Sequence, residues 1–328
     1  MKATKVRWQV VVTFCLALSS VNEARAQVAM HPAGTYLYVP NFDGKFVAVI
    51  NTSTNAVVAR VAVGGNTRGV AIDPAGTRVY ASNFSGDTVT VIDAATNTVS
   101  ATVPVDRFPS GMAMSPSGAR VYVTHHFRNT LSVIDTVSDT VIATMVTGKD
   151  GSDRGPSVGP LGIALNPAGT RLYLGNPAGA IIDTTTHTVS GAMPVGSRPT
   201  ALALNPTGTR VYVTDGSSHS VSVIDTSKNV EVAAIPVGHE PAGLALNPAG
   251  TRMYVADYGD NTVSVIDVAR NTAISKILVP ERPFAVTVNP MGTRAYVASP
   301  GGNNVWVIDT TSHTVIATLA VGRPPVGR

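Results

Sequence analysis

The chain has 328 residues and a formal net charge of +4, with 44% hydrophobic, 13% charged and 5% aromatic residues. Soluble domains usually contain about 25% charged residues, so this composition excludes a disordered chain, a coiled coil and an ordinary helical protein. The 30 glycines and 22 prolines predict many turns. Together with abundant Val and Thr, they favour an all-β protein built from short strands.

Residues 1–26 have the pattern of an export signal. An apolar run at residues 10–18, too short to span a bilayer, follows a positively charged start, and residues 24–26 match a small-x-small cleavage site. We therefore predict a signal peptide at residues 1–26 and a mature protein at residues 27–328. The mature protein is expected in the periplasm, at the cell surface or in the medium, with no membrane-spanning segment.

Removal of this segment would change the thiol content and the charge. The single cysteine, Cys15, lies within it, so the mature chain has no disulfide and no CxxCH motif for covalent haem. The segment contains four basic residues and one acidic residue, which leaves about +1 for the mature chain. This charge gives no indication of nucleic-acid binding.

A unit of about 42 residues is repeated seven times along the mature chain. The motif VID, or a variant of it, ends at the same place in each copy: Asn51, Asp93, Asp135, Asp183, Asp225, Asp267 and Asp309. The proline of an NPxGT-like turn recurs in step with it: Pro32, Pro74, Pro116, Pro167, Pro206, Pro248 and Pro290. The fourth copy is longer, and its polar, Gly-rich insertion at residues 147–160 is expected to form a surface loop.

The residue pattern of each copy predicts four strands. In the second copy they lie at residues 69–73, 77–83, 88–93 and 99–103, with Pro74 in the turn after the first strand. Four-stranded units repeated at this spacing are typical of the blades of a β-propeller. The sequence therefore predicts a seven-bladed β-propeller of four-stranded antiparallel blades, each built from one continuous segment.

The repeat motifs resemble those of a known family. The sequence YVT at residues 122–124 and 212–214, followed by VID at residues 133–135 and 223–225, is similar to the YVTN β-propeller repeat. The resemblance covers residues 28–322. It implies the seven-bladed fold and kinship with surface-layer, lactonase-like and cytochrome-associated propellers, and it supplies no catalytic motif.

Two equivalent positions in the copies of the repeat, one basic and one acidic, predict structural ion pairs. An arginine starts the second strand in six copies, and the exception has Tyr36 there and Asn51 in place of the VID aspartate. The expected hairpin register places Arg78 opposite Asp93 and Arg210 opposite Asp225. Cross-strand pairs of this kind contribute about 0.2–1 kcal/mol each.

The turns between second and third strands share one face of the propeller with the connections between blades, and we call it the loop face. Most phenylalanines of the predicted mature chain lie on this face, beside basic residues of blades 7, 1, 2 and 3. We predict that this positive aromatic arc binds a ligand through Phe42, Arg68, Phe84, Arg107, Phe108, His126, Arg282 and Phe284. The first strand of each blade is expected to line the central channel, and its residues are small and apolar.

These features favour an exported, monomeric binding or scaffold module for a protein, a glycan or an extended polymer. We expect no catalytic residue, no metal and no cofactor. A lactonase-like hydrolase is the alternative, and its available ionisable groups are spread over four blades: His126, His219, His239, Glu240 and Asp257. Single-stranded nucleic-acid binding is a further alternative, because rings lie beside basic groups, but the low net charge disfavours it.

Overall fold

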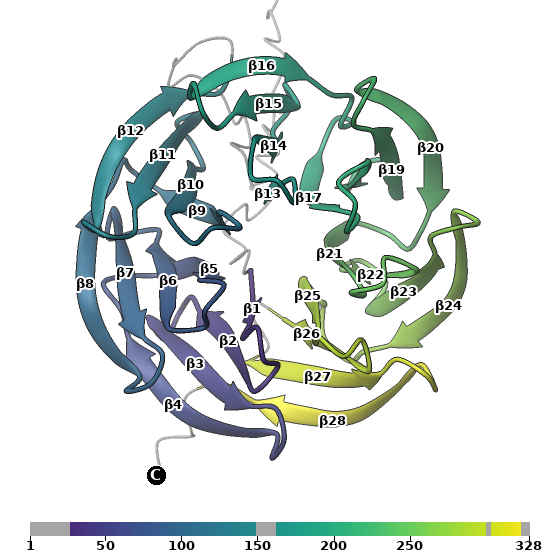
Figure 1. The fold of residues 1–328 in the computed structure, drawn as a ribbon. Helices are drawn as coiled ribbons and strands as arrows, with labels where there is room; N and C mark the ends of the chain where they lie inside the picture. The colour runs from purple at the N-terminus through teal and green to yellow at the C-terminus, as the bar shows by residue number, and fades with distance from the viewer. Residues whose placement is uncertain (1–26, 149–161, 300–302, 323–328) are drawn as a thin grey trace, which may run out of the picture.

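All regular structure in the part of the chain described here consists of antiparallel β-strands. The computed structural model describes residues 27–148, 162–299 and 303–322. Within them, 28 strands form seven four-stranded sheets, each made of consecutive strands. The sheets stand around a central axis as the blades of a ring (Figure 1). The predicted seven-bladed β-propeller is confirmed.

In every blade the first strand is innermost and the fourth is outermost (Figure 1). Blade 1 contains β1 (Ala29–Met30), β2 (Tyr36–Asn41), β3 (Phe46–Asn51) and β4 (Ala56–Ala62). Blade 2 contains β5 (Thr67–Ile72), β6 (Arg78–Asn83), β7 (Thr88–Asp93) and β8 (Thr98–Pro104). Blade 3 contains β9 (Pro109–Met114), β10 (Arg120–His125), β11 (Thr130–Asp135) and β12 (Thr140–Val146).

The remaining four blades follow the same order. Blade 4 contains β13 (Gly162–Leu165), β14 (Arg171–Gly175), β15 (Ala180–Asp183) and β16 (Thr188–Ala192). Blade 5 contains β17 (Pro199–Leu204), β18 (Arg210–Asp215), β19 (Ser220–Asp225) and β20 (Val230–Pro236). Blade 6 contains β21 (Pro241–Leu246), β22 (Arg252–Asp257), β23 (Thr262–Asp267) and β24 (Thr272–Leu278). Blade 7 contains β25 (Ala285–Val288), β26 (Arg294–Ala298), β27 (Asn304–Asp309) and β28 (Thr314–Ala320).

The hydrophobic core lies between adjacent blades. The second and third strands are buried on both faces, as in β6 and β7, whereas the outer strand β8 alternates and stays largely exposed. Side chains of neighbouring blades share each core cluster; Val89 of blade 2 packs in the same cluster as Val121 of blade 3. The tyrosine of the repeat motif is buried in every blade: Tyr38, Tyr80, Tyr122, Tyr173, Tyr212, Tyr254 and Tyr296.

The ring closes by packing between blades 7 and 1. One core cluster contains Leu37 and Ile50 of blade 1 together with Tyr296 and Val307 of blade 7, and the two blades lie side by side in Figure 1. Each sheet contains one continuous segment, so the prediction that no strand is exchanged between blades is confirmed. The predicted insertion at residues 147–160 lies outside the described residues, apart from residues 147 and 148.

The predicted arginine–aspartate register is confirmed, and one of the two predicted contacts is wrong. Arg210 lies opposite Asp225, and its Nη1 is 2.5 Å from the Asp225 Oδ2. Arg78 also lies opposite Asp93, but its guanidinium donates instead to the Thr136 carbonyl and the Asp139 carboxylate of blade 3.

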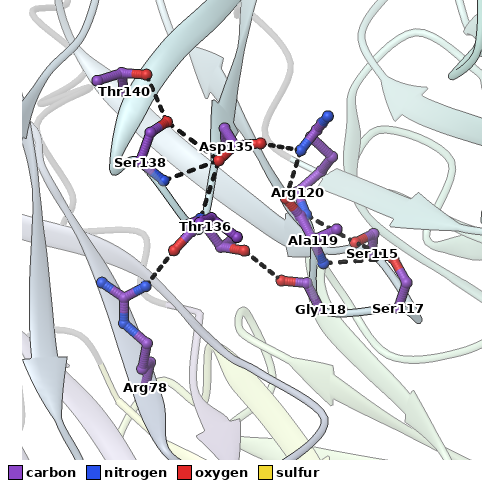
Figure 2. Close-up of polar contacts among 11 residues, drawn as sticks. Arg78, Ser115, Ser117, Gly118, Ala119, Arg120, Asp135, Thr136, Ser138 and Thr140 are labelled. Atoms are coloured by element: carbon purple, nitrogen blue, oxygen red, sulfur yellow. Dashed lines mark hydrogen bonds and ion pairs between the residues drawn. The ribbon is translucent and has the colours of Figure 1, made fainter.

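Asp139 gives Arg78 a charged partner in the next blade. The equivalent position is asparagine or histidine in most blades, whereas blade 3 offers a carboxylate there. Arg294 also donates to a threonine carbonyl of the next blade, Thr52, where the equivalent position is Asn55. Asp139 therefore adds a charge-assisted hydrogen bond to a contact between blades that does not require it. Figure 2 shows Arg78 reaching Thr136 while Arg120 binds Asp135 within blade 3.

Candidate functional site

Five rings from three blades gather on the loop face, and we call them the aromatic cluster. Phe42 follows β2, Phe84 follows β6, Phe108 precedes β9, and His126 and Phe127 follow β10. The Phe84 ring is central, with centroids 5.3–6.2 Å from those of the other four rings. Four of the predicted ligand-binding residues are therefore brought together.

A buried cation lies under this cluster. The Arg68 guanidinium carbon is 3.6 Å from the Phe84 ring centroid and 5.4 Å from that of Phe42. Arg68 is only 2% exposed. A guanidinium held against an aromatic face in a desolvated site contributes about 2 kcal/mol through the cation–π interaction. Arg68 is therefore part of the support of the cluster.

Exposure divides the cluster into a support and a contact surface. Phe84 is 9% exposed and His126 is 2% exposed, so both lie below the surface with Arg68. Phe42 and Phe108 are half-buried, and Phe127 is 44% exposed. Phe84, Arg68 and His126 were predicted to bind a ligand, but their burial leaves little of them accessible at the surface.

Phe127 is the most exposed ring of the cluster, and the predicted set omits it. It belongs to the same turn as His126, and their ring centroids are 4.3 Å apart. It also packs edge-on against Phe108, at 5.4 Å between centroids. A second aromatic residue beside His126 in a loop-face turn is the sequence signal that could have identified it.

Phe108 adopts a backbone conformation that is unusual for a bulky residue. Its φ is 59°, in the left-handed region that costs non-glycine residues free energy. The Phe108 N–H donates to the Asp87 Oδ1 at 3.0 Å, and its carbonyl accepts from the His126 N–H at 2.9 Å. These bonds hold the ring inside the cluster and leave the neighbouring Arg107 exposed.

Arg282 and Phe284 belong to a second, smaller group at blades 6 and 7. The Phe284 ring packs edge-on against Tyr258, with centroids 6.3 Å apart. The Arg282 Nη1 donates to the Tyr258 hydroxyl at 3.0 Å, and its guanidinium carbon lies 5.3 Å from that ring centroid. The predicted arc therefore consists of two separate groups.

A cavity of about 160 Å³ on the inner strands lies between the two groups. Arg68 lines it from one side and Phe284 from another, and the wall between them is formed by small and aliphatic residues, as predicted for the channel. Gln27, which sequence reasoning did not single out, also lines it. The Gln27 side-chain amide pairs with the backbone of Met112, at 2.9 and 3.0 Å, and so ties the segment before β1 to blade 3.

Three of the candidate hydrolase residues meet at the junction of blades 5 and 6. The His219 and His239 ring centroids are 4.8 Å apart, and the Glu240 N–H donates to the His219 Nδ1 at 3.2 Å. The His239 Nδ1 is 2.6 Å from the Asp260 Oδ1. A carboxylate can orient an imidazole for proton transfer. However, the His239 side chain is 68% exposed, and neither imidazole lines the central cavity.

Asp257 is a buried structural carboxylate. Its Oδ2 accepts hydrogen bonds from the Thr262 and Ser264 hydroxyls at 2.9 and 2.7 Å, and its Oδ1 accepts from the Gly238 N–H at 3.0 Å. Asn83 has the equivalent place in blade 2 and donates to two hydroxyls of β7. These contacts join the second strand to the third, so Asp257 is assigned to the scaffold.

Asp257→Asn is expected to change how stability depends on pH. Burial raises the pKa of the Asp257 carboxyl above its ordinary value. A raised carboxyl pKa contributes its full stabilisation below the unfolded-state pKa and loses it as the pH rises through the folded-state pKa. The melting temperature of the wild type should therefore fall relative to that of the variant in melts from about pH 4 to about pH 8. A constant difference would contradict this.

Comparison with known proteins supports the propeller fold. A family model described as the cytochrome D1 heme domain matches residues 17–154. No curated protein matches the chain. Kuenenia stuttgartiensis hydrazine synthase is 22% identical, with a TM-score of 0.78, over 88% of this chain and 96% of that chain. The Myceliophteria thermophila Cps50 (Swd1) β-propeller domain is 12% identical, with a TM-score of 0.71, over 87% of this chain and 95% of that chain.

These likenesses place the chain among β-propellers. The family model covers less than half of the chain, and both solved structures are less than 25% identical, so they show the fold alone. The finer resemblance to the YVTN repeat stays a prediction.

The haem implied by the family model does not fit the central cavity. Haem iron in proteins takes an axial His, Cys, Met or Tyr ligand. None of these residues is among the described residues that line the cavity. Its volume of about 160 Å³ is also below the ~300 Å³ at which pockets for drug-sized ligands begin. Across the described parts of the chain, no group of three or more His, Cys, Asp or Glu could hold a metal ion.

Proposed function

We propose that this chain is a non-catalytic binding module that captures an extended segment of a partner protein on its loop face. The observation that carries the proposal is the aromatic cluster, in which Phe127 stands 44% exposed beside half-buried Phe42 and Phe108. Aromatic residues are enriched at the centres of protein interfaces and supply much of their affinity.

The support of the cluster favours recognition by a rigid surface. Phe84 is packed on Arg68, and both are buried, so the outer rings stand on a fixed base. A surface that is ordered before binding loses less conformational entropy when the partner arrives. Arg107, next to Phe108, and Lys45, in the turn of Phe42, are exposed. The expected partner segment therefore has an apolar or aromatic anchor flanked by acidic residues.

Export is part of the proposal and is supported by the leader-like sequence of residues 1–26. In the described portion of the chain, no helix has the length and apolarity needed to cross a membrane. The hydrolase alternative is less well supported, because the His239 side chain is 68% exposed and Asp257 is committed to internal hydrogen bonds. The nucleic-acid alternative is disfavoured by the low net charge of the mature chain.

Phe127→Ala is expected to remove most of the affinity for partner segments. A random-peptide display library selected on residues 27–328 should yield peptides rich in aromatic or aliphatic residues beside Asp and Glu. Truncation of a central anchor costs about 2 kcal/mol or more, so the Kd of the selected peptides should rise about thirtyfold. Arg107→Ala should have a smaller effect, because a charge at the rim of an interface contributes less.

His187→Ala is the matched control, because His187 lies in a turn on the opposite face, after β15. It should leave peptide binding unchanged. Peptides that bind the Phe127→Ala variant as tightly as the wild type would contradict the proposal. Binding to an oligosaccharide array that depends on Phe127, with no peptide selected, would replace the protein partner with a glycan.

A further inference from the structure

A histidine is buried at the base of the turn that carries Phe127. His125 is the last residue of β10 and is 0% exposed. Its Nε2 lies 2.9 Å from the Ser132 Oγ of β11. Histidine is the side chain whose charge ordinarily changes between about pH 5 and pH 8. A proton on His125 would therefore place a charge inside blade 3, where the loss of water makes a charge costly.

The other blades hold no basic residue at the position of His125. The equivalent residues are amides, carboxylates and a serine: Asn41, Asn83, Asn176, Asp215, Asp257 and Ser299. In blade 2, the Asn83 amide donates to the Thr90 hydroxyl at 2.8 Å, and Ser132 has the place of Thr90 in blade 3. Blade 3 therefore makes the same contact between its second and third strands with a group that can gain a proton.

The groups around His125 favour its uncharged form. Burial lowers the pKa of the His125 imidazole below its ordinary value, and the nearby Asp106 carboxylate offsets only part of this effect. Asp106 is already engaged, because its Oδ2 accepts from the Thr130 hydroxyl at 2.8 Å and its Oδ1 lies 3.7 Å from the Arg128 Nε. The titratable and charged residues on the surrounding loop-face segments are Asp87, Asp106, Arg107, His126 and Arg128.

His125 lies where two rings of the aromatic cluster are anchored. It is opposite Pro109, which follows Phe108, and the register between β9 and β10 shifts just before it. Its carbonyl accepts from the Arg128 N–H at 3.3 Å, and this bond closes the turn that contains Phe127. Parts of a protein with few and weak bonds open at a lower free energy than the core. An opening at this strand end would move Phe127 while the interior of blade 3 stays folded.

We propose that His125 is an acid-sensitive switch of the turn at residues 126–129. At neutral pH the uncharged imidazole packs inside blade 3 and holds Phe127 in the aromatic cluster. As the pH falls below about 6.5, at which a histidine in water gains its proton, the state in which the ring reaches water is favoured and the turn opens. Release of a bound partner on acidification rests on the proposed function, whereas the opening of the turn does not.

Fluorine NMR of the protein with para-fluorophenylalanine in place of Phe127 reports the turn directly. The fraction of the ring in a water-exposed environment should rise about fivefold or more from about pH 7.5 to about pH 5. His125→Asn is the matched control, because Asn83 makes the equivalent contact in blade 2 and an amide does not titrate. Its spectrum should stay constant over this range. The control retains His126, so a difference between the two proteins belongs to His125.

Thermal melts give a second measure. A lowered imidazole pKa contributes stability that is present above the unfolded-state pKa and is lost as the pH falls through the folded-state pKa. The melting temperature of the wild type should therefore fall relative to that of His125→Asn between about pH 7.5 and about pH 5. If this variant fails to fold, His125→Ser, which introduces the residue that blade 7 has at this position, takes its place.

The same pH response of the fluorine spectrum in the wild type and in the variant, or no response in the wild type, would overturn the switch. Peptides selected at neutral pH should bind the wild type more weakly at about pH 5 and should lose less affinity for His125→Asn. If the turn opens in acid while peptide affinity does not change, capture through Phe127 is wrong and the switch stands.

Discussion

Replacement of Phe84 by alanine is expected to lower the free energy of unfolding by about 3–5 kcal/mol. The Phe84 ring is buried, it contacts four other rings of the aromatic cluster, and it stacks on Arg68. Its loss would leave a cavity and would also remove the cation–π partner of a buried guanidinium. Urea denaturation of the variant and the wild type, followed by tryptophan fluorescence, measures the difference.

Phe127→Ala is the control for this experiment, because it removes the same side chain from a site that is 44% exposed. The loss of stability should be smaller, about 1 kcal/mol, since the Phe127 side chain is partly exposed to water in the folded state. Equal losses in the two variants would show that the division into support and contact surface is wrong.

Gly243→Ala is expected to destabilise the junction of blades 6 and 7. The Gly243 N–H donates to the Phe284 carbonyl at 2.7 Å across this junction. A Cβ at Gly243 would lie 2.4 Å from that carbonyl oxygen and 3.0 Å from the Ala285 Cα, so the backbone of blade 7 would have to move. Overpacking of this kind costs about 1–3 kcal/mol, and the melting temperature should fall accordingly.

The matched control is Gly191→Ala in the outer strand β16. A Cβ there would meet only the Ile181 Cδ1, at 3.9 Å, which is an ordinary contact. Replacing glycine where alanine fits stabilises a protein by about 0.4–1 kcal/mol through the unfolded state. The two substitutions should therefore change stability in opposite directions. A stabilising effect of Gly243→Ala would contradict the close approach of the inner strands.

The fold could be predicted because each blade repeats the same local pattern. The third strand of blade 2 was predicted at the residues where β7 lies, and the strands around it differ by one or two residues at their ends. Strand register also followed from the repeat, since Arg210 pairs with Asp225 as expected. Because the unit is repeated, equivalent positions can be compared between copies within a single sequence.

Contacts between blades could not be predicted in the same way. Arg78 bonds to Asp139, which lies 61 residues further along the chain and in the next blade. The burial of Arg68 depends on rings from blades 1 and 2, and the bond between Gln27 and Met112 crosses from blade 1 to blade 3. These contacts arise where the pattern of the repeat is broken, so comparison of the copies identifies the residues but not their partners.

Site-specific photo-crosslinking tests the recognition surface most directly. A benzophenone amino acid would replace Phe127 in one variant and His187, on the opposite face, in another, in cells that produce the protein. The account predicts that irradiation gives discrete covalent adducts with a protein partner at position 127 and none at position 187. Adducts at position 187 with none at position 127 would contradict it.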